Sequence, residues 1–168
     1  PLTNAQIRVT NECIADMQSG KPMSRLVQGD VGSGKTSVAA ALCFVCAKNG
    51  YQSALMAPTE ILADQHLQTF QNFLQDIPIH VELLTGNIKG KRRSAIEEGL
   101  QNGSVNILIG THAVIEDNVQ FNNLGLVIID EQHRFGVVQR ARLWQKSNIC
   151  PHVLVMTATP IPRTLAMT

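Results

Sequence analysis

Short apolar runs rich in β-branched residues alternate with longer stretches of helical periodicity along this chain. Runs of this length, bounded by polar or turn-forming residues, are typical of strands. We expect strands over residues 25–28, 53–57, 80–84, 105–109, 124–130 and 152–156. Several of them are apolar at successive positions, as strands buried between two helical layers must be.

The segments between these runs have the length and spacing of helices. Residues 59–74 carry Leu62, His66, Leu67 and Phe70 at helical intervals, and Asn102-Gly103 has the form of a helix stop followed by a turn. Strand–helix alternation predicts parallel βαβ units. With no repeat, linker or composition break, residues 1–168 are expected to form a single α/β domain of three layers around a mostly parallel sheet.

The composition fits one soluble domain and restricts its partners. The chain has 168 residues, of which 44% are hydrophobic and 16% charged, and this excludes disorder. A net charge of +1 means that any nucleic-acid contact must be local. The longest apolar stretch, residues 38–47, is too short to span a bilayer, so we expect no membrane partner. The chain opens at Pro1 with no basic-plus-apolar leader, so we expect no secretory signal, a cytoplasmic location, and either an excised fragment or a trimmed terminus.

The four cysteines do not indicate a metal site. Cys43 and Cys46 have the spacing of a ligand pair, but they lie in an apolar run that predicts one buried face of a helix. Cys13 and Cys150 are too isolated to supply a second pair.

A phosphate-binding motif follows the first predicted strand. Residues 29–36 satisfy G-x-x-x-x-G-K-[ST] and precede a predicted helix. Glycines let backbone N–H groups converge on phosphate without Cβ clashes, and the helix N-terminus adds partial positive charge. The lysine would neutralise the β- and γ-phosphates, and the threonine hydroxyl would ligate Mg²⁺; a Gly-rich turn with a solvated lysine is the alternative. The residues expected to hold the nucleotide are Gly29, Asp30, Gly32, Ser33, Gly34, Lys35 and Thr36.

Two carboxylates follow the most apolar predicted strand. Asp130 and Glu131 stand at its carboxyl end, the edge at which open α/β sheets bind ligands. Asp130 can hold Mg²⁺ through its water shell, and Glu131 can orient and deprotonate an attacking water. The alternative, surface charges that cap the next helix, fits poorly with the buried run of residues 126–129.

Together these motifs resemble the first motor domain of superfamily 2 helicases, and the likeness covers nearly the whole chain. Residues 57–66 resemble motif Ia, residues 110–113 motif Ib, and residues 156–163 motif III. One bacterial branch of these helicases, which remodels DNA forks, has motifs similar to the strings GDVGSGKT, DEQHRFGVVQR and MTATPIPRTLA. Transcription-repair coupling translocases share much of the pattern.

The resemblance implies a RecA-like P-loop fold and an ATP hydrolase that uses Mg²⁺ and moves on double-stranded DNA. It implies remodelling of stalled forks and branched junctions in recombination and repair. The nucleotide roles fall on Lys35, Thr36, Asp130 and Glu131, with Thr36 and Asp130 toward the metal. A stand-alone P-loop phosphotransferase and a nucleotide-dependent binding module are the alternatives from other classes.

Coupling residues follow from the same resemblance. His133 resembles the last position of the DExH box, which links nucleotide state to DNA engagement. Thr157 and Thr159 resemble the coupling threonines of motif III, although a polar strand end capping the turn at Pro160 is the alternative.

Near the start of the chain, residues 2–6 resemble the segment whose glutamine reads adenine. Gln6 would make this contact. Thr3 and Gln6 also form a capping box, and the two interpretations stay open.

The DNA face is expected at motifs Ia and Ib. Thr59 and Thr111 would offer hydroxyls and nearby N–H groups to phosphates, and Thr85-Gly86 falls where the family has another phosphate-contacting turn. A basic cluster, defined as Lys89, Lys91, Arg92 and Arg93, stands at a predicted helix start. It is either a DNA contact or a solvated face.

The chain ends just after motif III. The family's second RecA-like domain and the wedge domain of the fork-remodelling branch do not lie within it. We therefore expect weak nucleotide binding and little turnover from this chain alone, because the family's arginine finger comes from the second domain.

Overall fold

The computed structural model describes residues 4–18, 24–28, 35–115, 119–130 and 152–157. Helices and strands alternate through most of this part of the chain. In order, the elements are α1 (Asn4–Gln18), β1 (Ser24–Gln28), α2 (Lys35–Lys48), β2 (Gln52–Met56), α3 (Glu60–Phe73), β3 (Val81–Leu84), α4 (Gly90–Asn102), β4 (Ile107–Gly110), the 3₁₀ helix η1 (His112–Ile115), β5 (Leu124–Asp130) and β6 (His152–Thr157).

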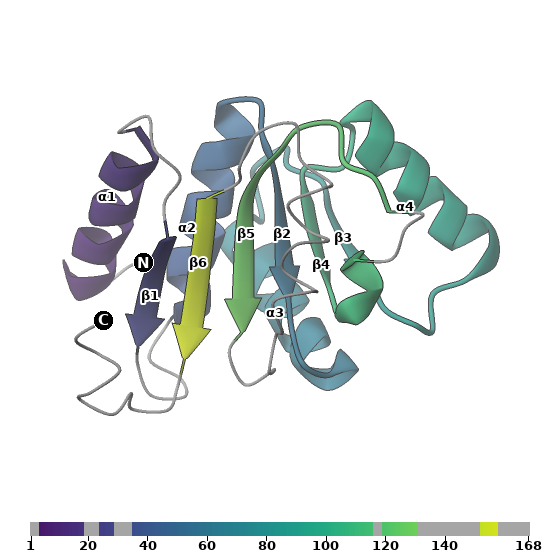
Figure 1. The fold of residues 1–168 in the computed structure, drawn as a ribbon, viewed down its shortest axis with the longest axis horizontal. Helices are drawn as coiled ribbons and strands as arrows, with labels where there is room; N and C mark the ends of the chain where they lie inside the picture. Colours follow the sequence, from purple (N-terminus) through teal and green to yellow (C-terminus); the bar gives the residue numbers. More distant parts are fainter. Residues whose placement is uncertain (1–3, 19–23, 29–34, 116–118, 131–151, 158–168) are drawn as a thin grey trace.

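The strands form one sheet in the order β1-β6-β5-β2-β4-β3, as Figure 1 shows. Every pair of neighbouring strands is parallel. All the carboxyl ends of these strands therefore lie at the same edge of the sheet. The predicted α/β fold with a mostly parallel sheet is confirmed.

The predicted strands are all present, with small differences at their ends. β5 has the predicted bounds, whereas β4 begins two residues later than predicted. The two preceding residues bond elsewhere: the Val105 N–H donates to the Gly99 carbonyl, and the Asn106 side chain accepts from the His80 N–H. Both residues are thereby held by neighbours outside the strand.

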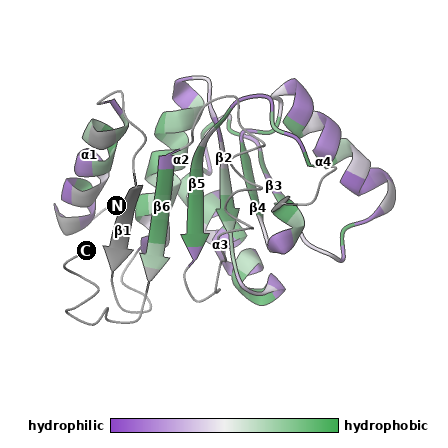
Figure 2. Cartoon of the chain, in the orientation of Figure 1, coloured by the Kyte–Doolittle hydropathy of each residue, from purple (hydrophilic) through white to green (hydrophobic). Residues whose placement is uncertain are grey.

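Two apolar cores fill the two faces of the sheet. One joins α1, α2 and α3 to residues such as Leu55, Leu126 and Ile128, and the other joins α4 and η1 to residues such as Leu108 and Val127. Alternate positions of β5 thus enter opposite cores, which is why the strand is apolar throughout. Figure 2 shows the hydrophobic colouring concentrated on the central strands and α2. The three-layer arrangement is confirmed.

Helix ends match local sequence signals. The Thr59 hydroxyl accepts a hydrogen bond from the Leu62 N–H and so caps α3, as its residue type favours. α4 ends at Asn102, and Gly103 takes the left-handed conformation that glycine allows. The start of α4 carries no side-chain cap and no acidic residue in its first turn.

Cys43 and Cys46 lie on the buried side of α2, as predicted. Burial raises the pKa of the Cys46 thiol to about 11 and raises that of Cys43 as well. Both thiols therefore stay protonated near neutral pH and are poor nucleophiles.

A buried glutamine joins three segments at the amino edge of the sheet. The Gln52 amide nitrogen donates to the carbonyls of Leu100 and Val105, and its oxygen accepts from the Asn123 N–H at 2.8 Å. Gln52 is 3% exposed. It therefore satisfies polar backbone groups that water does not reach.

Gly110, at the carboxyl end of β4, allows a close approach between β4 and β3. A Cβ atom at this position would overlap the Leu84 carbonyl oxygen of β3 and lie 2.9 Å from the Val114 side chain. Because the nearest obstacle is backbone, a side chain here would force β3 and β4 apart.

We expect Gln52→Leu to destabilise the chain by about 1–3 kcal/mol, because the Val105 carbonyl and the Asn123 N–H lose this hydrogen-bond partner, whereas the Leu100 carbonyl keeps the Asn122 N–H. Urea unfolding followed by circular dichroism measures this loss. Gln68→Leu, at an exposed position of α3, is the matched control and should change stability little. Equal effects of the two substitutions would contradict the role of Gln52.

We expect Gly110→Ala to lower the free energy of unfolding by about 1–3 kcal/mol through overpacking against β3. Gly86→Ala is the control, because a Cβ there meets nothing within 4 Å. A thermal melt of both variants gives the comparison. A Gly110→Ala chain as stable as the control would show that the two strands can separate at little cost.

Candidate functional site

The phosphate-binding motif joins β1 to α2 at the carboxyl edge of the sheet. Its residues 29–34, which include Gly29, Asp30, Gly32, Ser33 and Gly34, lie outside the described residues. Lys35 and Thr36 are the first two residues of α2 and are partly buried. They therefore stand at a helix N-terminus, where N–H groups lack intrahelical partners and attract anions.

Asp130 is the last residue of β5, and it is 8% exposed. It has the strand parity of Leu126 and Ile128, which face the core formed with α2 and α3. Its side chain is thus delivered to the same face and edge as the start of α2. Glu131 and His133 lie outside the described residues.

A histidine connects the two motifs. His66 of α3 lies between them: its Nδ1 is 3.3 Å from the Thr36 hydroxyl oxygen, and its Nε2 is 3.2 Å from Oδ2 of Asp130. The three residues come from α2, α3 and β5, and His66 is only 9% exposed. The structure therefore brings Thr36 and Asp130 within the reach of one imidazole ring.

The hydrogen-bond types in this group follow from the chemistry of its members. In the tautomer that carries its proton on Nε2, His66 donates from Nε2–H to the Asp130 carboxylate. In a neutral imidazole, Nδ1 is then an acceptor, and the Thr36 hydroxyl donates to it. The Thr36 proton is then directed at the imidazole, and the lone pairs of the hydroxyl oxygen stay available for another partner.

The donor set fits a magnesium ion. Mg²⁺ prefers hard oxygen ligands, takes only one or two from protein, and keeps several waters. A threonine hydroxyl and a carboxylate at one sheet edge, beside a helix N-terminus, supply such ligands. These residues could hold the ion together with nucleotide phosphates.

The helical spacing of His66 with Leu62 and Phe70 predicts a place on the apolar side of a helix and indicates no role in the site. The structure agrees with the helix position, since Ala63, His66 and Phe70 are its buried residues. A polar residue on a buried helix face was the available signal, because such a side chain needs hydrogen-bond partners. Its partners, however, lie 30 and 64 residues away.

The predicted DNA-contacting residues gather at the same edge but differ in exposure. Thr59 and Gly86 are exposed, whereas Thr85 and Thr111 are each 4% exposed. Asn87 donates to the Glu60 carboxylate at 2.6 Å and so ties the turn after β3 to the start of α3. Thr59 and Gly86 are therefore the accessible ones among these four predicted residues.

Several other predicted residues are only partly described. Thr157 ends β6 and pairs in register with Gln28 of β1, while Thr159 lies outside the described residues. Gln6 lies in the first turn of α1, where its carbonyl accepts from the Thr10 hydroxyl. Thr3 of the proposed capping box is not among the described residues.

The basic cluster lies at the start of α4. Lys89, Lys91 and Arg92 are exposed, and Arg93 is paired with Glu97 at 3.5 Å. The prediction that these charges open a helix is confirmed.

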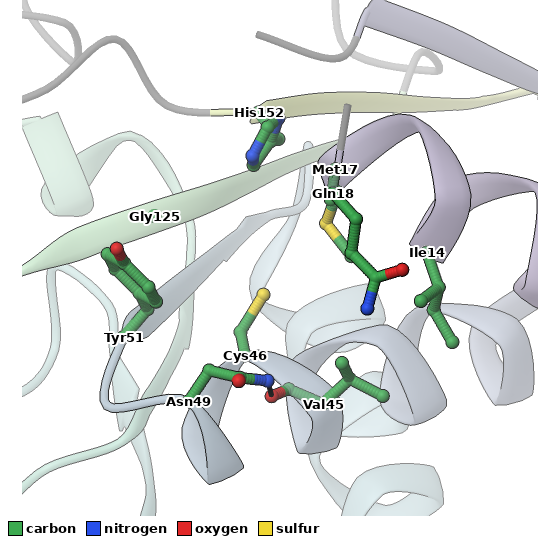
Figure 3. A pocket seen from close by; sticks show the side chains of 9 residues that line it. All are labelled: Ile14, Met17, Gln18, Val45, Cys46, Asn49, Tyr51, Gly125 and His152. Atoms are coloured by element: carbon green, nitrogen blue, oxygen red, sulfur yellow. Dashed lines mark hydrogen bonds between the residues drawn. The ribbon is translucent and has the colours of Figure 1, made fainter. Parts of the chain in front are cut away.

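A cavity of about 220 Å³ lies at the opposite edge, at the amino ends of the strands. Figure 3 shows side chains of α1 and α2 around it, with His152 of β6 above. Burial lowers the pKa of His152. Ligands of open α/β sheets bind at the carboxyl edge, so this cavity is not the nucleotide site.

None of the helices in the described part of the chain combines the length and the apolar character that a membrane span requires.

Residues 6–168 match the family model of DEAD/DEAH box helicases. Among curated relatives, the ATP-dependent DNA helicase RecG of Synechocystis sp. is 56% identical over 99% of this chain and 20% of that protein. RecG of Bacillus subtilis is also 56% identical, over 100% of this chain and 24% of that protein. The chain thus spans about a quarter or less of the relatives it matches.

A solved structure described as RecG bound to a three-way DNA junction superposes with a TM-score of 0.85. The two sequences are 47% identical, and the match covers 99% of this chain and 22% of the chain in that structure. The bacterial branch indicated by the long motif strings is therefore RecG. Motifs, fold and the match over nearly all residues agree: this chain belongs to the DEAD/DEAH box helicase family.

Proposed function

We propose that residues 1–168 form the first RecA-like motor domain of an ATP-dependent DNA helicase that remodels branched DNA. The observation that carries the proposal is the meeting of Thr36 and Asp130 across His66. It joins the phosphate-binding motif to the acidic motif at the edge where parallel α/β sheets bind nucleotides. The similarity to RecG supports the choice of DNA as the partner.

In this proposal, the chain's own residues bind and orient ATP. Lys35 neutralises the β- and γ-phosphates, and the N–H groups of residues 29–34 and the start of α2 hold them. Thr36 and Asp130 would hold Mg²⁺, which when bound offsets charge on the phosphate oxygens. Glu131 orients the attacking water and takes its proton, and Gln6 reads the adenine.

The other domains of the proposed helicase would belong to a longer protein. The relatives are four to five times the length of this chain, which supports a second RecA-like domain and a wedge domain as partners. Arginines from the second domain would approach the γ-phosphate. Coupling between the nucleotide state and DNA binding would fall on His133, Thr157 and Thr159.

The DNA would contact the carboxyl edge beyond α3 and β3. Thr59 and Gly86 are exposed there, and the N-terminus of α3 offers N–H groups to phosphate. Thr85 and Thr111, being buried, would act by positioning these turns. Such contacts fix the strand without reading its sequence.

We expect this chain alone to bind Mg²⁺–ATP weakly and to hydrolyse it about a thousandfold more slowly than the full-length protein with branched DNA, because the arginine finger is missing. Lys35→Ala in the full-length protein should abolish the DNA-stimulated ATPase. Lys48→Ala, at the other end of α2, is the control. A coupled ATPase assay with and without a three-way junction measures both. Turnover by this chain equal to that of the full-length protein, or hydrolysis indifferent to DNA, would contradict the proposal.

We expect substitution of Lys89, Lys91 and Arg92 by Gln in the full-length protein to flatten the salt dependence of DNA affinity. Each lost phosphate contact should reduce the slope of log K against log salt concentration by about 0.9. Fluorescence anisotropy across a salt series gives the slope, and Arg8→Gln on α1 is the control. An unchanged slope would mean that this cluster is a solvated face.

A further inference from the structure

We propose that His66 is a positioning residue for Mg²⁺–nucleotide binding, which orients the Thr36 hydroxyl and the Asp130 carboxylate at the same time. The inference rests on the proposed function, since it requires that these two residues face the metal. It adds to that function a side chain from α3 that acts through Thr36 and Asp130.

The orientation follows from the two hydrogen bonds of the imidazole. When the Thr36 hydroxyl donates to Nδ1 at 3.3 Å, its proton cannot point toward a cation, so the oxygen presents lone pairs there. When Nε2–H donates to Oδ2 of Asp130 at 3.2 Å, it fixes the rotation of the carboxylate. Removing a side chain that hydrogen-bonds to metal ligands and orients them commonly lowers the metal affinity by about 10–100-fold.

Packing alone does not explain this side chain. His66 is flanked on the buried face of α3 by Ala63 and Phe70, which are fully buried and apolar. An apolar residue would fill the same space without the cost of desolvating two ring nitrogens. Both nitrogens are instead bonded to residues of the two nucleotide motifs.

Three substitutions in the full-length protein separate orientation from packing. His66→Leu keeps apolar volume but no hydrogen bond, and His66→Asn is polar but too short to reach both partners. His66→Gln can span them, because its amide has both a donor and an acceptor. His80→Gln is the control, since that ring lies at the surface and pairs with Glu82.

The test is equilibrium binding of a fluorescent, non-hydrolysable ATP analogue, titrated with MgCl₂ and repeated in EDTA. We expect the Leu and Asn variants to need about tenfold or more Mg²⁺ to reach half-maximal binding, with unchanged affinity in EDTA. The Gln variant should stay near the wild type. Melting temperatures show which variants fold, and the Asn variant carries the test if the Leu variant does not.

The outcomes distinguish the two proposals. A wild-type Mg²⁺ requirement in a folded Leu or Asn variant would overturn the role of His66 and leave the proposed function intact. Equal loss of affinity with Mg²⁺ and in EDTA would also overturn it, because that pattern indicates general disruption. A wild-type protein whose nucleotide binding ignores Mg²⁺ would overturn the proposed function and this inference with it.

Discussion

Parallel pairing of the strands is the constraint on which the candidate site depends. β5 lies between β6 and β2, and its register with both sets where Asp130 ends up. A slip of one residue would turn every side chain of β5 to the other face. The Asp130 carboxylate would then lie on the face of the sheet away from α2 and α3. The apolar residues of β5 would each move into the opposite core. The burial of Leu126 and Val127 in opposite cores therefore holds the chemistry of the site in place.

The sequence was sufficient for the fold because apolar strand runs and helix signals agreed at each level. The bounds of β5 and the stop at Gly103 were readable from local residues. The site was readable only in part. The phosphate-binding and acidic motifs were recognisable from residue types, but His66 has the helical spacing of a core residue. Its role depends on contacts across long separations, which no local pattern encodes. The burial of Thr85 and Thr111 likewise comes from tertiary packing.

α3 connects the two sides of the proposed motor. Its cap, Thr59, is exposed at the proposed DNA edge, and His66 lies about two turns further along, against the nucleotide motifs. A bond from Asn87 to Glu60 ties the first turn of the helix to the loop after β3. A packed helix transmits a displacement at one end to the other with little loss, because side chains in a close-packed interior cannot shift independently.

The place of β1 in the sheet has a consequence for synthesis on the ribosome. β1 is an edge strand, and its neighbour in the described sheet is β6, from the far end of this chain. Among the described strands, the one that leads into the phosphate-binding motif therefore has no neighbour to pair with until residues 152–157 have emerged. Until then the nascent chain exposes the unpaired edges of β1 and β5, which invite pairing with other chains. In this order of assembly, β1 is synthesised early but gains its neighbour in the described sheet only when β6 forms.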